Sequence, residues 1–172
     1  LPESVSRSTG YLDRLNQVTP SIGHVGGYIG LTGTAAQLGL PKTNFWIYPG
    51  EQYEQHLDAF LKDPDNTDLP LTYISFPSAK DPDFSRRYPG RATIEIVAPA
   101  PYSIFAPWAG STWGKRGDDY EALKRTYGER LLEQRADPLG EWLGQIRVAP
   151  GVPGHRGAQV EISISHAGYG IT

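Results

Sequence analysis

Apolar and polar residues alternate along several short segments of this chain, with the period of two that is typical of β-strands. The clearest case is residues 92–98 (ATIEIVA). Ile94 and Ile96 share one face of this segment, whereas Glu95 and Val97 share the other. Similar patterns predict further strands at residues 24–32, 44–48, 71–76 and 160–165. Residues 44–48 carry large apolar side chains on both faces, which predicts that both faces are covered.

The segment 24–32 contains three glycines, Gly26, Gly27 and Gly30. Glycine weakens a strand, so such positions mark either a β-bulge or a place where another backbone or a ligand comes close. Both interpretations remain open from the sequence, and the bulge is the simpler of the two.

A helical spacing of apolar residues predicts helices at residues 6–17, 51–62 and 118–134. The start of the last helix is the clearest, because Asp118 can cap its free N–H groups while Glu121 reaches back in a capping-box arrangement. Glu121 is also expected to pair with Arg125, one turn further along. Residues 92–134 are therefore predicted to form a strand, a bend and a capped helix.

Short strands joined by loops and short helices favour the α+β class. We expect a mostly antiparallel, twisted sheet of about five strands with short helices on one face. Residues 1–134 form the α+β segment of this prediction. After residue 134 the sequence is interrupted by Asp137, Pro138 and Gly140, so residues 135–172 are expected to be a divergent segment with one strand.

Composition and charge limit the possible functions. A length of 172 residues suits one domain. The formal net charge of −3 offers no general positive field for a phosphate backbone, so nucleic acid is not an expected partner. No apolar run approaches the ~18 residues of a membrane span, and we expect no signal peptide within these residues. The localisation stays open, because the absence of cysteine is compatible with any compartment.

The first residue is Leu1 and the chain contains no methionine, so we expect a processed or excised segment.

No metal site is predicted. The four histidines are His24, His56, His155 and His166, and no two have the i,i+4 spacing, with a glutamate, of a helical zinc site. The acidic turn at residues 63–68 lacks the glycine and the bidentate glutamate of a calcium loop. It is interpreted as a solvated loop.

Nucleotide chemistry is disfavoured for similar reasons. The segment 109–116 (AGSTWGKR) nearly matches a phosphate-binding loop, but Ala109 replaces its first glycine and Arg116 its hydroxyl residue. Ala109 also breaks a nucleophile-elbow pattern around Ser111. Gly27, Gly30 and Gly33 have the wrong spacing for a dinucleotide fingerprint.

Aromatic residues are unusually frequent in or beside the predicted strands. They are either core residues or, for those on one side of the sheet, the wall of an apolar ligand pocket. The set comprises Trp46, Tyr48, Tyr73, Tyr102, Phe105, Trp108 and Trp113.

Several stretches together resemble the phytoene desaturase, carotenoid isomerase and retinol saturase group of FAD-dependent oxidoreductases. The resemblance covers residues 1–134 and is strongest at the last of these stretches. They are residues 38–41 (LGLP), 44–49 (NFWIYP), 73–82 (YISFPSAKDP), 88–90 (YPG) and 113–133 (WGKRGDDYEALKRTYGERLLE).

In that family the corresponding segment is the substrate domain, inserted between the halves of a Rossmann-type FAD domain, and its sheet roofs a tunnel for long isoprenoid chains. The resemblance implies dehydrogenation, saturation or isomerisation of a carbon–carbon double bond in an apolar polyene or lipid-like substrate. It also implies FAD as the cofactor of the parent protein and the remainder of a flavin domain as the partner of this segment. Peripheral membrane contact is implied only for the intact parent.

The departures from the family are equally informative. Neither the N-terminal glycine fingerprint nor the C-terminal flavin-binding segment is found here, so this chain alone is not expected to hold FAD or to be active. The alternative function is a non-catalytic module that binds an apolar ligand or a protein. No catalytic residue is assigned. The candidate substrate-binding residues, each with a structural role as the alternative, are His24, Tyr28, Trp46, Tyr48, Tyr73 and Trp108.

Overall fold

The computed structural model describes residues 2–18, 22–112 and 114–133 and the backbone of residues 158–165. Two short 3₁₀ turns, Tyr102–Ile104 and Ala106–Trp108, follow strand β4. In chain order the helices and strands are α1 (Glu3–Ser8), α2 (Tyr11–Leu15), β1 (Gly23–Thr32), β2 (Phe45–Ile47), α3 (Tyr53–Lys62), β3 (Thr72–Ser75), α4 (Pro77–Lys80), α5 (Phe84–Arg87), β4 (Arg91–Ala100), α6 (Asp118–Glu133) and β5 (Ala158–Ser165).

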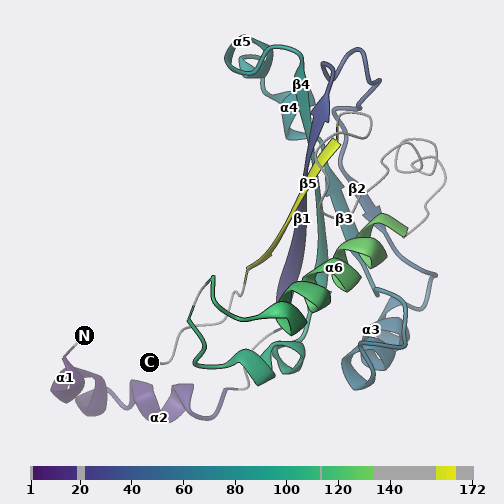
Figure 1. Ribbon diagram of the computed structural model, residues 1–172. Helices are drawn as coiled ribbons and strands as arrows, with labels where there is room; N and C mark the ends of the chain where they lie inside the picture. The colour runs from purple at the N-terminus through teal and green to yellow at the C-terminus, as the bar shows by residue number, and fades with distance from the viewer. Residues whose placement is uncertain (1, 19–21, 113, 134–157, 166–172) are drawn as a thin grey trace.

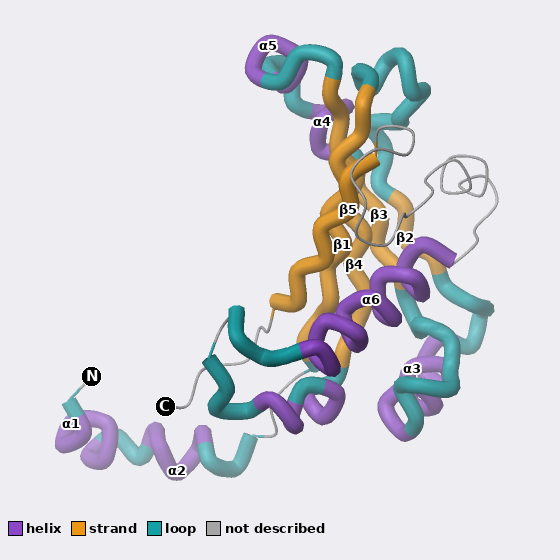
Figure 2. The backbone as a smooth tube through the Cα atoms, viewed as in Figure 1, coloured by secondary structure: helices purple, strands orange, loops and turns teal. Residues whose placement is uncertain are grey.

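The five strands form one sheet in the order β2-β3-β4-β1-β5, and every neighbouring pair is antiparallel. Helix α6 crosses one face of the sheet and contacts β1, β4 and β5. Helices α4 and α5 lie at the end of the sheet where β4 begins (Figure 1). Helices α1 and α2 lie away from the sheet (Figure 2). The predicted α+β fold with a mostly antiparallel sheet is confirmed.

The two faces of the sheet differ in what covers them. One face, here called the core face, carries the buried apolar side chains of β1, β3 and β4 and packs against α6. It includes Val25, Ile29, Ile74, Ile94 and Ile96, each at most 2% exposed. The register places the remaining strand residues on the opposite face, here called the open face. The residues of the open face that matter below are His24, Gly26, Tyr28, Gly30, Trp46, Tyr73, Ser75, Thr93, Glu95, Val97 and Pro99.

The glycines of β1 do not form a bulge, so that interpretation is wrong. Strand β1 pairs without interruption with both of its neighbours, β4 and β5. At Gly27 a Cβ atom would lie 3.5 Å from Leu131 Cδ1 of α6. This is an ordinary van der Waals distance, so Leu131 of α6 packs next to Gly27 but leaves room for a methyl group.

Arg130 of α6 fastens the acidic loop at residues 63–68 to the core. Its Nη1 atom donates to the carbonyl oxygen of Pro64 at 2.7 Å, and its Nη2 atom donates to that of Thr67 at 2.6 Å. The guanidinium carbon lies 5.0 Å from the ring centroid of Tyr127 and 5.9 Å from that of Phe60. One side chain thus connects α6, α3 and the loop that follows α3.

Helix boundaries and pairings differ from the sequence predictions most clearly in three places. The helix expected at 6–17 is two helices, because the chain breaks at Gly10, whose φ of 64° is left-handed. Helix α6 begins at Asp118 itself, after Gly117 with a φ of 84°, so Asp118 is a helical residue and not the cap. Glu121 pairs with Lys124 at 3.1 Å and not with Arg125.

Candidate functional site

A row of apolar and aromatic residues crosses four strands on the open face. The register pairs Trp46 with Tyr73, Tyr73 with Val97, and Val97 with Gly26. The Trp46 and Tyr73 ring centroids are 4.8 Å apart, and the rings are tilted by 54°. Because neighbouring strands lie about 4.8 Å apart, the row extends about 14 Å from β2 to β1. We call these four residues the aromatic row.

The aromatic row is uncovered at its β2 end. Trp46 is 60% exposed, so no described residue covers this face of β2. The expectation that both faces of residues 44–48 are covered is therefore wrong. The cause is the position of β2 at the edge of the sheet, where its one neighbouring strand is β3. An exposed tryptophan packed against a tyrosine is a surface that suits an apolar ligand.

At its β1 end the aromatic row is closed by Tyr28. Gly26 is buried although it belongs to the open face. A Cβ atom at Gly26 would lie 3.2 Å from Cε2 of the Tyr28 ring, so the ring folds back over this glycine. The missing side chain at position 26 therefore determines where the Tyr28 ring rests.

A polar row runs beside the aromatic row. The register pairs Tyr28 with Glu95 and Glu95 with Ser75. The Ser75 hydroxyl oxygen accepts a hydrogen bond from Lys80 Nζ at 2.9 Å, and Lys80 also donates to Oδ1 of Asn44. Glu95 is partly buried, and among the described residues no hydrogen bond or ion pair to its carboxylate is found. We call Tyr28, Glu95 and Ser75 the polar row.

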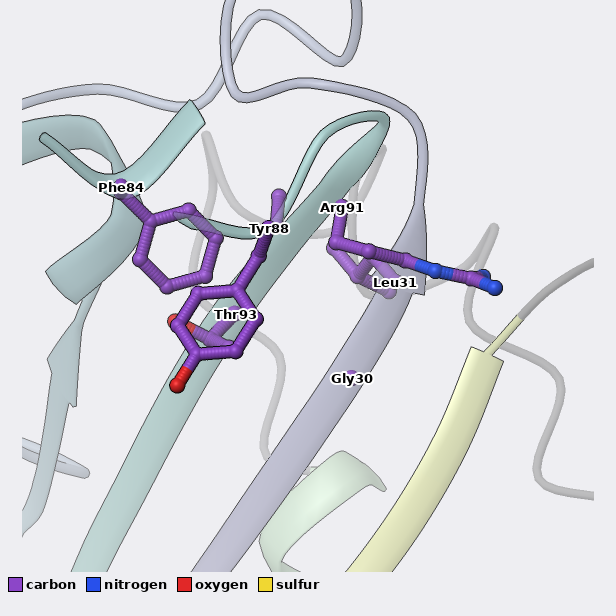
Figure 3. Close-up of a pocket in the computed structure, with 7 residues that line it drawn as sticks. Gly30, Leu31, Phe84, Tyr88, Arg91 and Thr93 are labelled. Carbon is purple, nitrogen blue, oxygen red and sulfur yellow. The ribbon is translucent and has the colours of Figure 1, made fainter. Parts of the chain in front are cut away.

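A hollow of about 530 Å³ continues the open face beyond the polar row (Figure 3). Gly30 lies two residues after Tyr28 in β1, and its partner Thr93 lies two residues before Glu95 in β4. In Figure 3 the ring of Phe84, in α5, and the ring of Tyr88, directly after α5, lie beside each other and near Thr93. Their centroids are 5.1 Å apart. The lining residues are Gly30, Leu31, Phe84, Tyr88, Arg91, Ala92 and Thr93.

Hydrogen bonds hold this hollow in shape. The Ser78 hydroxyl of α4 accepts from the Thr93 backbone N–H at 2.9 Å and donates to the Thr93 carbonyl at 3.3 Å. Arg91 Nη1 donates to the Thr32 hydroxyl at 2.9 Å, across the β1–β4 pair. These contacts attach α4 to β4 and join the ends of the two long strands.

The structure brings four of the six candidate substrate-binding residues onto one face. His24, Tyr28, Trp46 and Tyr73 lie on the open face. The other two lie elsewhere: Tyr48 follows β2 with its ring centroid 6.1 Å from that of Tyr53, and Trp108 packs edge-on against Tyr120 at 5.3 Å, beside the core. The binding roles of all six remain predictions.

Sequence reasoning singled out Gly26 as a bulge or a place of close approach, but it overlooked Ser75, Glu95 and Val97 as residues of the open face. The signal for two of them was present, because the alternation at residues 92–98 separates Glu95 and Val97 from the core isoleucines. No sequence signal identified Phe84 as a neighbour of Gly30.

The described residues do not fit a flavin adenine dinucleotide site. Such a site binds the pyrophosphate at a helix N-terminus that follows a parallel strand and a glycine-rich turn. Here all strand pairs are antiparallel, and the described chain after β1 continues into a turn instead of a helix. In the same part of the chain, no three His, Cys, Asp or Glu side chains are grouped to hold a metal ion. None of the described helices is long and apolar enough to cross a membrane.

Comparison with known proteins gives a consistent set of relatives. The chain is 35% identical over 135 residues to all-trans-retinol 13,14-reductase from Macaca fascicularis and from Homo sapiens, which is 77% of this chain and 22% of those proteins. It is 29% identical over 124 residues to a protein of Danio rerio named inactive all-trans-retinol 13,14-reductase. No family model matches the chain, and no solved structure matches significantly.

The chain spans about a fifth of the length of the curated relatives that it matches. Within that span the similarity agrees with the family motifs found along residues 38–133. Over about three quarters of its length, this chain is therefore homologous to the all-trans-retinol 13,14-reductases, the retinol saturase group of oxidoreductases.

Proposed function

We propose that this chain forms the substrate-binding sheet of an FAD-dependent oxidoreductase that acts on a carbon–carbon double bond of an apolar polyene. The relatives are named as reductases of all-trans-retinol, a polyene alcohol, at positions 13 and 14. We therefore infer a retinol-like substrate for the protein that contains this segment.

The aromatic row is the observation that carries this proposal. A flat, conjugated chain gains dispersion contacts and loses little entropy when it lies on fixed rings. The row offers Trp46 and Tyr73 in contact, and beyond them the Val97 side chain and the backbone at Gly26. Its extent of about 14 Å is sufficient to hold most of a polyene chain across the strands.

The redox chemistry in this proposal belongs to parts of the protein outside this segment. A flavin supplies hydride transfer when it is bound, and the protein orients it against the substrate. Since the described residues do not fit a dinucleotide, we assign the flavin to the remainder of the protein. The role of this segment is then to hold the polyene against the flavin and to exclude water.

A non-catalytic apolar-ligand or protein-binding module is the second candidate. One observation favours it: the Danio rerio relative named as inactive matches 69% of this chain. The same sheet is thus compatible with a protein that binds an apolar ligand without reducing it.

Fluorescence of all-trans-retinol tests the proposal on this chain directly. Retinol emission is expected to rise on addition of the chain and to saturate. Trp46→Ala should weaken binding about tenfold, because it removes a large aromatic contact surface. Tyr11→Ala, which removes an equally exposed ring from α2, should leave binding unchanged. An unsaturable signal, or equal loss in both variants, would contradict a site on the aromatic row.

The catalytic part of the proposal is tested on the full-length protein. It should carry flavin absorbance after purification and, when an electron donor is supplied, should reduce one carbon–carbon double bond of all-trans-retinol. A flavin-free full-length protein that binds retinol with unchanged strength would favour the second candidate.

A further inference from the structure

The open face has an apolar side and a polar side, and Glu95 lies where they meet. We propose that Glu95 binds the hydroxyl group of the polyene and thereby selects an alcohol over its ether or hydrocarbon analogue. This inference rests on the proposed function, and it adds to it a residue that determines which polyene is accepted.

The two rows place the end of a bound chain near Glu95. Glu95 and Val97 are same-face neighbours on β4, about 6.6 Å apart along the strand. A chain that lies over Trp46 and Tyr73 reaches Val97 next. The terminal group of the polyene then lies close enough to β4 for the side chain of Glu95 to reach it.

The position of Tyr28 explains why the bound polyene ends at this point. The Tyr28 ring lies over Gly26, the last residue of the aromatic row, while the residue as a whole stays exposed. A polyene that extends past Val97 therefore meets the Tyr28 ring instead of exposed backbone. The terminal group then turns along β4, where Glu95 offers a hydrogen-bond acceptor and Pro99, on the other side of Val97, offers no polar side-chain atom.

The chemistry of Glu95 suits an alcohol. An ionised carboxylate only accepts hydrogen bonds, and bonds to it are stronger than those between neutral groups. The described residues provide Glu95 with no partner of their own, so a ligand O–H would supply one. A methyl ether at the same place offers no proton and leaves a partly buried carboxylate without its water.

The polar row is also held in place for this role. Ser75, the other neighbour of Glu95 across the strands, is fixed by its hydrogen bond from Lys80, which is itself bonded to Asn44. The carboxylate thus has beside it, on the neighbouring strand β3, a serine whose hydroxyl group is fixed by a hydrogen bond.

The test compares the dissociation constants of all-trans-retinol and its methyl ether for the 172-residue chain. The unmodified chain should prefer the alcohol by about tenfold, the size of one hydrogen bond to a charged group. Glu95→Leu should reduce this ratio to about one, mainly by tightening the binding of the ether. Glu95→Gln keeps a neutral acceptor and should give an intermediate ratio. Glu129→Leu, an exposed carboxylate on α6, is the control and should keep the full ratio.

The outcomes separate this inference from the proposed function. Equal affinity for the two ligands in the unmodified chain, or an unchanged ratio in Glu95→Leu, would overturn the role of Glu95 while the binding face stands. Absence of saturable binding for both ligands would overturn the proposed function together with the inference. Circular dichroism checks that each variant folds. If Glu95→Leu does not fold, the Glu95→Gln variant decides the question.

Discussion

At the scale of single residues, Tyr127 is buried with its hydroxyl group unsatisfied among the described residues. Burial raises the pKa of Tyr127 above its usual value, and the neighbouring Arg130 guanidinium opposes this increase. The folded state therefore binds the phenolic proton more tightly than the unfolded state. It follows that the free energy of unfolding is undiminished below about pH 10 and falls as the pH rises above it.

Tyr127→Phe tests this assignment. The variant keeps the ring and removes a hydroxyl that makes no hydrogen bond, so its stability near pH 7 should equal that of the parent or exceed it by about 1 kcal/mol. Its loss of stability above about pH 10 should be shallower. Urea unfolding at both pH values measures the two effects. A loss of more than about 1 kcal/mol near pH 7 would show that the hydroxyl is bonded in the folded protein.

The glycines of β1 show how much a single residue type reveals. The sequence indicated three sites without side chains, which is compatible with a bulge or with close packing. Only the structure distinguishes them, because the choice depends on what approaches each glycine. Leu131 of α6 approaches Gly27 on one face, and Tyr28 covers Gly26 on the other. These neighbours are set by tertiary packing and by a side-chain rotamer, and neither follows from the local sequence.

At the scale of elements, α6 is attached to the rest of the molecule by its core stripe and by Arg130. The arginine donates to two loop carbonyl oxygens and lies against two rings, so it orders the connection between α3 and β3. The sequence gave no sign of this contact, because its partners are backbone carbonyl groups more than sixty residues away.

The Arg130→Met variant measures how much that attachment contributes to the free energy of unfolding. Methionine keeps much of the apolar stem but loses both hydrogen bonds, and the expected cost is about 2 kcal/mol in the free energy of unfolding. Arg125→Met, on an exposed position of the same helix, should change stability by less than about 0.5 kcal/mol. Chemical denaturation of both variants provides the comparison. Equal effects would mean that the loop contact contributes nothing specific.

The positions of the strands and of the longer helices were largely predictable, whereas the short helices α4 and α5 and the partners of each element were not. The alternation in β4 separated Ile94 and Ile96 from Glu95 and Val97, and the structure keeps that division. The pairing of Glu121 was mispredicted, because residues three and four positions apart are both neighbours on a helix and spacing alone does not choose between them. The coverage of β2 was mispredicted because an apolar strand pattern does not show whether the strand lies at an edge.

At the scale of the whole molecule, the fold divides its tasks between the two faces of one sheet. Helix α6 and the core face provide stability, and the open face presents the aromatic row, the polar row and the hollow beside α5. The homologous reductases and the inactive relative share this segment by sequence. This division is consistent with a segment that holds the substrate while another part of the protein performs the reaction.

Nuclear magnetic resonance tests the central claim most directly, because it locates the ligand on the sheet. All-trans-retinol is added to the ¹⁵N-labelled chain, and amide and indole shifts are followed to saturation. The account predicts that the largest changes fall on the Trp46 indole and on the amides of Tyr73, Glu95 and Val97. Saturable binding with its largest changes on α2 or α3, or no binding at all, would contradict it.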